Sequence, residues 1–121
     1  MDANTFIDAL RRLETDRDPD PLAALYADDA VAGNTAIDRE FTGQDGAREF
    51  WSRYRDAFDT IESQFRNVVE QDGVAILEWT STAKTDGGPE FEYEGVTVVV
   101  TDGERITRST AYFDPRALIP A

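Results

Sequence analysis

The stretch FEYEGVTVVVTDGERITRSTAYFD, residues 91–114, gives the strongest indication of the fold. Residues 91–101 are rich in β-branched and aromatic side chains, which favour strands. The dipeptide Asp102-Gly103 that follows is typical of a two-residue hairpin turn, after which residues 104–114 return as a second strand. The stretch therefore predicts an antiparallel hairpin near the C-terminal end of the sequence.

A two-residue turn also predicts the register of this hairpin. It places Val96 opposite Ser109 and Glu94 opposite Ala111, with Phe113 on the same side of the sheet. Both sides of the hairpin carry apolar residues, so both are expected to be covered. We expect helices on one side and a second copy of the chain on the other.

Two more strands and three helices are expected before the hairpin. Alternating apolar residues predict strands over residues 60–69 and 74–83, joined by a turn at residues 71–73. Helical spacing predicts a first helix capped by Asn4 or Thr5, a short second helix ending near Asp28 and Asp29, and an aromatic third helix after residues 43–46. The order predicts a single α+β domain over residues 1–121, with three N-terminal helices packed in a curved antiparallel sheet of four to six strands.

The composition excludes several classes of function. A net charge of −13 argues against partners such as nucleic acid and anionic membrane surfaces. The absence of cysteine and histidine excludes disulfides, thiol nucleophiles, ordinary zinc sites and the common serine–histidine mechanisms. No metal and no cofactor is therefore expected. The sequence starts with acidic rather than basic and apolar residues, which leads us to expect a cytoplasmic protein.

The charged residues are unevenly distributed among the residue types. Lys84 is the only lysine beside eleven arginines, and fifteen aspartates outnumber ten glutamates. An acidic, lysine-poor surface is what a salt-loaded cytoplasm would favour, because counterions screen the self-repulsion. A GC-rich genome that favours arginine and aspartate codons would give the same pattern.

Several segments resemble the nuclear-transport-factor-two-like superfamily. They are residues 25–31 (LYADDAV), 41–43 (FTG), 103–106 (GERI) and 111–114 (AYFD). The resemblance covers essentially the whole chain and is strongest to the SnoaL-like polyketide cyclase and ketosteroid isomerase branches. It implies a cone-shaped fold with an internal pocket, and it puts Ser109, Ala111 and Phe113 on the pocket face. The opposite, outer face of the sheet would then hold the homodimer contact, formed by Tyr93, Thr97, Val99, Arg108, Thr110 and Tyr112.

The catalytic positions of ketosteroid isomerases can be compared through this resemblance. The general-base aspartate falls on Asn34, the oxyanion tyrosine on Leu10 and the oxyanion aspartate on Val96. With all three replaced, that mechanism has neither a base nor a donor to the enolate oxygen. Ketosteroid isomerase activity is therefore not expected.

Two carboxylates are candidates for acid–base chemistry. In the predicted register Glu94 points inward beside Val96 and Trp79, where burial would raise its pKa and make it a usable acid or base. Alternatively, Glu94 lies in solvent at the rim of the cone. Asp114 is the second candidate, although ending the last strand or forming an ion pair would explain it equally well.

Other residues are expected to shape the pocket. Asn34, Asn67 and Tyr54 could donate hydrogen bonds to a ligand, or could instead satisfy backbone groups and fill the core. Trp79, Phe113 and Trp51 would form walls around a cavity or fill it. The full predicted set of ligand-contacting residues is Asn34, Tyr54, Asn67, Trp79, Val96, Ser109, Ala111, Phe113, Trp51 and Leu10.

Two functions remain open at this point. One is a cofactor-free enzyme that isomerises, cyclises or hydrates a small apolar carbonyl compound, as the resemblance implies. The other is a non-catalytic ligand-binding or dimerisation module with the same fold, because the superfamily includes such modules. The sequence identifies neither the substrate nor the reaction.

Overall fold

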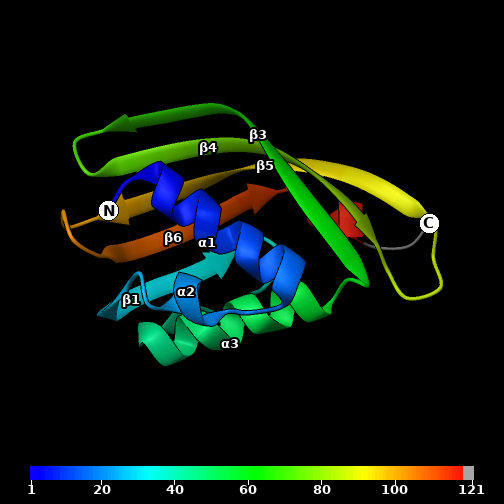
Figure 1. The fold of residues 1–121 in the computed structure, drawn as a ribbon, viewed down its shortest axis with the longest axis horizontal. Coiled ribbons are helices and arrows are strands. Elements are labelled where there is room, and N and C mark those ends of the chain that lie inside the picture. Colours follow the sequence, from blue (N-terminus) through cyan, green and yellow to red (C-terminus); the bar gives the residue numbers. More distant parts are fainter. Residues whose placement is uncertain (119–121) are drawn as a thin grey trace.

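The computed structural model describes residues 1–118, which form helices on one six-stranded sheet (Figure 1). The predicted α+β class with a curved sheet is confirmed. The helices are α1 (Ala3–Asp16), α2 (Asp20–Ala23) and α3 (Gly43–Asp56). The strands are β1 (Tyr26–Asn34), β2 (Phe41–Thr42), β3 (Thr60–Gln71), β4 (Val74–Lys84), β5 (Glu90–Thr101) and β6 (Ile106–Phe113), and a 3₁₀ turn, η1 (Pro115–Leu118), follows.

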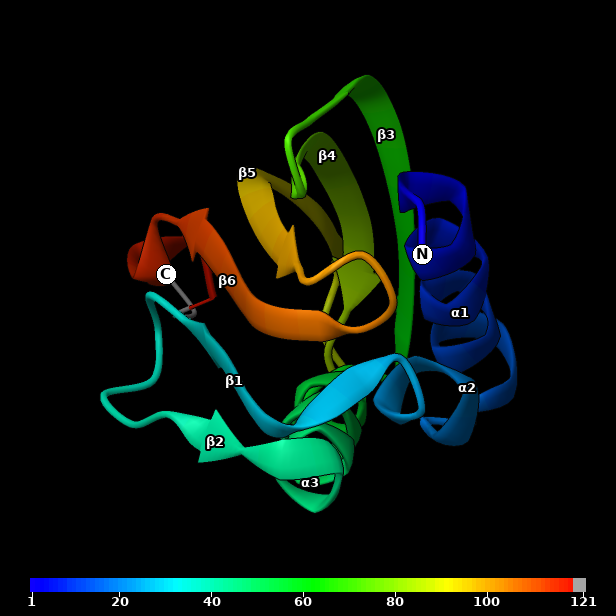
Figure 2. The same ribbon diagram turned by 90° about the vertical axis from the view of Figure 1, so that its left-hand side faces the viewer.

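The sheet is mixed rather than purely antiparallel. Its strand order is β2-β1-β6-β5-β4-β3, and β1 runs parallel to β6 while the other neighbours are antiparallel. Seen from one end, the strands follow a curve from β3 round to β2, with α1 beside β3 and α3 beside β1 and β2 (Figure 2). The two edge strands do not pair with each other, so the cone is open.

Both early helices differ in detail from the prediction. The carboxylate of Asp2, rather than Asn4 or Thr5, caps α1 by accepting a hydrogen bond from the Thr5 N–H at 2.9 Å. The second helix ends at Ala23 and not near residue 29. The apolar spacing of residues 22–26 fits a helix, but the chain becomes extended from Tyr26 because β1 pairs with the last strand. The two aspartates at positions 28 and 29 therefore lie exposed in a strand.

The predicted register of the C-terminal hairpin is wrong by three residues. Ser109 pairs with Val99 and not with Val96. The loop is wider than two residues, because Thr101 pairs with Ile106 and residues 102–105 lie between them. The Asp102 carboxylate stabilises this wider loop by accepting hydrogen bonds from the backbone N–H groups of residues 104 and 105. A bulge adjoins the turn at residues 100–101.

A shift by an odd number of residues turns every side chain of β5 to the other face. Glu94 and Val96, which were expected inside, therefore face outward. Tyr93, Thr97 and Val99, which were expected in an outer dimer contact, face inward and are buried. A second bulge, between Phe65 and Asn67 on β3, similarly reverses the expected face of Asn67.

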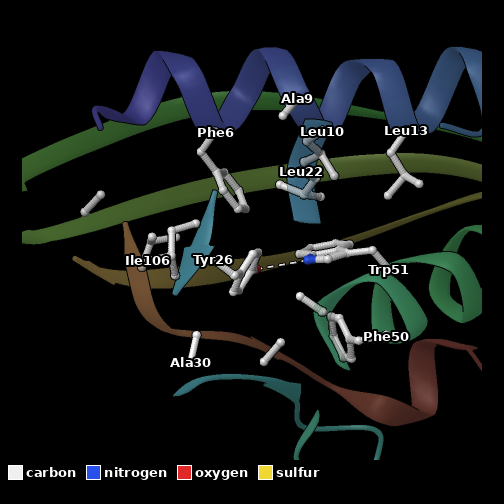
Figure 3. Close-up of a cluster of buried hydrophobic side chains, with 14 of the residues drawn as sticks. Phe6, Ala9, Leu10, Leu13, Leu22, Tyr26, Ala30, Phe50, Trp51 and Ile106 are labelled. Atoms are coloured by element: carbon white, nitrogen blue, oxygen red, sulfur yellow. Dashed lines mark hydrogen bonds between the residues drawn. The ribbon is translucent and has the colours of Figure 1, made fainter. Parts of the chain in front are cut away.

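The core lies between the helices and the inner face of the sheet (Figure 3). Phe6, Leu10 and Leu13 form the buried stripe of α1, at the three- and four-residue spacing of an amphipathic helix. Tyr26 and Trp51 meet them from β1 and α3. A second aromatic cluster is centred on residues 79, 93 and 113 and adjoins the first through α3. The fold thus places α1 against β3 and α3 against β1 and β2, so that side chains of both helices meet over the inner face of the sheet, where the functional candidates lie.

Within residues 1–118, the helices are all too short or too polar to cross a membrane.

Candidate functional site

An internal cavity of about 30 Å³ lies between α1, α3 and the inner face of the sheet. This volume holds about one or two water molecules, so side chains fill most of the cone. Part of the set predicted from the sequence does line it, namely Leu10, Asn34, Trp51, Tyr54, Trp79 and Ala111.

The cavity is bordered by a buried carboxylate, Glu14, that the sequence did not single out. Glu14 lies in the last turn of α1 and is 8% exposed. Its Oε1 accepts a hydrogen bond from the Ser63 N–H at 3.1 Å, and its Oε2 accepts one from Ser63 Oγ at 2.5 Å. Burial raises the pKa of Glu14, and the hydrogen bonds from Ser63 offset part of that rise. Among the described residues, no arginine or lysine forms an ion pair with this carboxylate.

The sequence does contain a signal for the burial of Glu14. The residue follows Leu10 by four positions, and therefore lies on the same face of α1. It was missed because it directly precedes the polar stretch 15–18, which marks the end of the helix. The position of β3, which packs against this last turn and supplies Ser63, cannot be deduced from residues 1–16 alone.

Two tyrosine hydroxyls meet next to the cavity. Tyr54 from α3 and Tyr93 from β5 form a hydrogen bond between their Oη atoms. Burial is the main cause of a rise in the pKa of Tyr93 to about 12, and burial also raises the pKa of Tyr54 well above its usual value. Both hydroxyls therefore keep their protons at neutral pH and can donate or accept hydrogen bonds.

A separate polar network fixes the other side of the core. The Tyr26 hydroxyl and Ser109 Oγ are 2.7 Å apart, and Trp51 Nε1 donates to the Tyr26 oxygen at 2.9 Å (Figure 3). Burial raises the pKa of Tyr26 to about 12. Ser109, predicted as a ligand contact, is buried, but its hydroxyl is bound to Tyr26 and it does not line the cavity.

Trp79 forms a wall whose position is set from two sides. Its Nε1 donates to Thr97 Oγ1 at 2.9 Å, and the Phe113 ring packs edge-on against it at 6.1 Å. Phe113 itself lies behind this wall rather than on the cavity surface. The indole also lies over Gly95, where an added Cβ would come within 2.7 Å of the ring. Thr97, which replaces Val96 on the inner face, borders the cavity.

The two carboxylates predicted as catalytic lie in solvent. Glu94 has a side chain 66% exposed and forms an ion pair with Arg66 at 2.9 Å, so its predicted inward orientation is wrong. Asp114 is also exposed and pairs with Arg116 at 2.9 Å, and hydrogen bonds from that arginine lower its pKa.

Both predicted asparagines have partners within the protein. The Asn67 amide donates to Glu78 Oε1 at 2.6 Å on the outer face, so this residue does not reach the cavity. Asn34 borders the cavity, but its Oδ1 accepts hydrogen bonds from the N–H groups of residues 36 and 37. Val96 is opposite Glu78 and Tyr112 on the outer face.

Glu14 also borders an open cleft on the outside of the protein. This cleft has a volume of about 330 Å³ and lies between the last turn of α1 and the start of β3. Arg11 and Arg55 contribute to its walls. The Arg55 guanidinium is buried and donates from Nε to the Glu14 carbonyl at 3.0 Å. The carboxylate therefore lies in the wall that separates the internal cavity from the surface.

A metal site would need converging carboxylates. Within residues 1–118, no three acidic side chains come together in that way.

Comparison with solved structures shows the same fold in distantly related proteins. A hypothetical protein from Catenulispora acidiphila with a ketosteroid isomerase-like fold is 20% identical, with a TM-score of 0.83 over 94% of this chain and 88% of that chain. The TerC protein is 16% identical, with a TM-score of 0.81 over 94% and 92% of the two chains. A putative SnoaL-like polyketide cyclase from Shewanella putrefaciens is 15% identical, with a TM-score of 0.76 over 95% and 90%.

The sequence itself places the chain in a family. A search of curated proteins gave no match. The sequence profile described as "SnoaL-like domain" matches residues 4–109, which is most of the chain. The resemblance inferred from the sequence is thereby confirmed, and the chain belongs to the SnoaL-like domain family.

Proposed function

We propose that the internal cavity is an acid–base site for a small, largely apolar carbonyl compound, and that Glu14 takes up and returns the proton. The observation that carries this proposal is the burial of the Glu14 carboxyl beside the cavity, without a cationic partner among the described residues. A carboxyl group in such surroundings is a stronger base than one in water, and its acid form persists closer to neutral pH. This role replaces the one that the sequence suggested for Glu94.

The cavity walls indicate the chemical class of the ligand. Leu10, Phe50, Trp51 and Trp79 offer apolar surface, whereas Tyr54 offers a hydroxyl. Sites for small molecules typically combine mostly apolar walls with a few polar groups of this kind. In this proposal the proton that leaves the carbon next to a carbonyl group is taken up by Glu14.

Structural neighbours support a small-molecule role for this fold. The Catenulispora acidiphila protein was crystallised with trimethylamine, and TerC with polyporic acid. These two ligands differ greatly in size. Since the cavity of this chain measures only about 30 Å³, a ligand larger than a few atoms requires its walls to move apart.

The proposal is tested by proton exchange on simple ketones. Acetone and cyclopentanone would be incubated with the protein in D₂O, and the loss of their α-proton signals followed by ¹H NMR. We expect the wild-type protein to accelerate exchange and Glu14→Gln to lose about 10²-fold or more of that acceleration, in the range of general acid–base catalysis. Glu62→Gln is the matched control, because Glu62 is the exposed neighbour of Ser63 on β3. Equal rates for the wild type and Glu14→Gln would contradict the role of Glu14.

A non-catalytic module is the second candidate function. The observation that favours it is the nearly filled cone, since a cavity of about 30 Å³ leaves little room for a substrate. In that case the role of Glu14 would be purely structural, joining α1 to β3 through its hydrogen bonds with Ser63. Absence of ketone exchange, combined with a large loss of stability in Glu14→Gln, would support this alternative.

We also propose that the protein forms a homodimer through the outer face of the sheet. The shifted register changes the predicted contact. Thr110, Arg108 and Tyr112 remain on the outer face, whereas the three predicted β5 residues face inward. The outer-face residues that replace them are apolar. Val96 lies opposite the exposed Tyr112, and Val98, Ile76 and Val69 form a row across β5, β4 and β3.

A further inference from the structure

A row of hydroxyl groups crosses the inner face of the sheet. Ser63 on β3 is directly opposite Ser81 on β4, and Ser81 is directly opposite Tyr93 on β5. All three residues are buried, with exposed fractions of 5%, 1% and 5%. Glu14 from α1 meets one end of the row, and Tyr54 from α3 meets the other. The helices thus place an ionisable carboxyl and a cavity-lining hydroxyl at opposite ends of one line.

Hydrogen bonds connect the members at each end of this row. Ser63 Oγ is 2.5 Å from Glu14 Oε2 and 2.6 Å from Ser81 Oγ. The hydroxyls of Tyr93 and Tyr54 bond to each other. Between these two groups, Ser81 and Tyr93 lie directly opposite each other on β4 and β5, with both side chains on the inner face. Each serine and tyrosine hydroxyl can donate one hydrogen bond and accept another, which is the requirement for a continuous chain.

We propose that the Ser81 and Tyr93 hydroxyls link these two groups, so that Glu14, Ser63, Ser81, Tyr93 and Tyr54 form a proton relay. The protonation state of Glu14 then decides whether the Tyr54 hydroxyl accepts or donates a hydrogen bond at the cavity. The proposal deepens the acid–base function proposed above and rests on it. Tyr54 is the catalytic residue of the relay, because it lines the cavity. Ser63, Ser81 and Tyr93 are positioning residues that act through their neighbours.

The donor-to-acceptor direction of the hydrogen bonds in the relay is set by Glu14 at one end. An ionised carboxylate only accepts, so Ser63 donates to it and each later hydroxyl donates toward Glu14. The Tyr54 oxygen then offers a lone pair to the cavity. When a ligand C–H bond breaks, the electron pair stays on the ligand, Tyr54 takes the proton, each hydroxyl passes on its own proton, and Glu14 receives the last one. With Glu14 protonated, all donors reverse and Tyr54 returns a proton to the ligand.

Few other charges act on this chain of hydroxyls. The charged groups that face Glu14 are Arg11 on its own helix, Glu62 on β3 and Arg55 on α3. Tyr54 and Tyr93 both lie within the electrostatic influence of Glu14, but Tyr26 does not. The chain contains no histidine and no cysteine, so no other side chain has an ordinary pKa near neutrality. Among side chains, a titration at a pH well above 4 therefore reports on carboxyls with raised pKa.

The relay is tested without any ligand by NMR. Tyrosine would be labelled with ¹³C at Cζ and glutamate at Cδ, and both would be followed from pH 4 to pH 9. The protein has four tyrosines, of which Tyr26 and the exposed Tyr112 serve as internal references. We expect the Tyr54 and Tyr93 signals to shift with the same midpoint as Glu14. In Ser81→Ala, which does not touch Glu14, the Glu14 titration should persist while Tyr54 and Tyr93 lose most of their linked shift.

Matched variants separate the relay from simpler explanations. Ser109→Ala removes an equally buried hydroxyl outside the row and should leave both linked shifts in place. Tyr93→Phe opens the same link from its other side, so it keeps the test decisive if Ser81→Ala fails to fold. Linked shifts that survive in both Ser81→Ala and Tyr93→Phe would show a through-space effect and overturn the relay. Ketone exchange that depends on Glu14 would then still support the proposed function, with Glu14 acting directly.

Discussion

Glu14 combines burial against aromatic side chains with hydrogen bonds from a single neighbouring serine. Its environment disfavours the ionised form, because the nearest strong donors to the carboxylate come from Ser63 and not from a guanidinium. Such a group costs stability when it is charged, and proteins retain costly buried carboxyls most often where they take part in chemistry. The cost itself can be measured through pH.

We predict that replacing Glu14 by glutamine changes the pH dependence of stability. The folded pKa of Glu14 is raised, so between the ordinary glutamate value and the raised one the folded chain binds more protons than the unfolded chain. Raising the pH through this range therefore lowers the free energy of unfolding that the residue contributes. Urea unfolding at several pH values should show Glu14→Gln becoming more stable relative to wild type as the pH rises. A difference that stays constant, or an equal trend in Glu62→Gln, would contradict the raised pKa.

We also predict that Gly95→Ala displaces Trp79. The added Cβ would lie 2.5 Å from the Tyr112 carbonyl oxygen and 2.7 Å from the indole. Forcing a methyl group into packed surroundings costs about 1–3 kcal/mol. Chemical unfolding gives the free energy, and tryptophan fluorescence reports the indole. Gly33→Ala is the control, because the nearest atom to its new Cβ would be 3.9 Å away. Equal stability of the two variants would contradict the close packing of Trp79.

At the level of elements, the spacing of apolar residues predicted the buried faces of helices and strands better than the sequence predicted how neighbouring strands pair. The stripe of Phe6, Leu10 and Leu13 and the alternation in β4 both identify the buried faces, since burial imposes these periods. The register of β5 against β6 depended on one turn. Asp102-Gly103 suits a two-residue turn, but the Asp102 carboxylate can also hold a wider loop, as it does here.

That single difference moved the proposed reactive group. With β5 shifted, Glu94 faces solvent and the buried carboxylate of the cavity is Glu14, on a different element. Local patterns could not have established this, because the surroundings of Glu14 come from β3 and α3, far along the chain. The cavity-lining residues on helices, such as Leu10 and Tyr54, were found more readily because helical spacing alone assigns their face.

The contribution of α1 to the cavity wall can be tested by shortening one of its side chains. We predict that Leu10→Ala enlarges the cavity and costs about 2–5 kcal/mol of unfolding free energy. Benzene should then stabilise this variant in thermal unfolding, because an apolar cavity of sufficient size takes up such a ligand. Leu22→Ala is the control, since Leu22 is fully buried but does not border the cavity. Benzene stabilising both variants equally, or neither, would contradict the position of Leu10.

For the whole molecule, we predict that Ile76→Lys disrupts a homodimer. Ile76 is 44% exposed on the outer face, beside Val69 and Val98, and burying an unpaired lysine there is costly. Val68→Lys is the matched control, because Val68 is 42% exposed but lies on the other face of β3. Sedimentation at several salt concentrations would measure the effect. Salt should favour the dimer by screening the net charge of −13. A wild-type protein that stays monomeric at every salt concentration would refute the proposed homodimer.

The parallel pairing of β1 with β6 has a consequence for synthesis on the ribosome. Residue 26 and residues 31–34 of β1 find their partners in residue 106 and residues 108–111 of β6, which are synthesised long after β1. The nascent chain therefore exposes one edge of β1 until the final strand arrives, and long-range pairing of this kind is slow to form. A ribosome-stalled chain ending at residue 105 should be cleaved rapidly by protease, whereas the released chain should resist it.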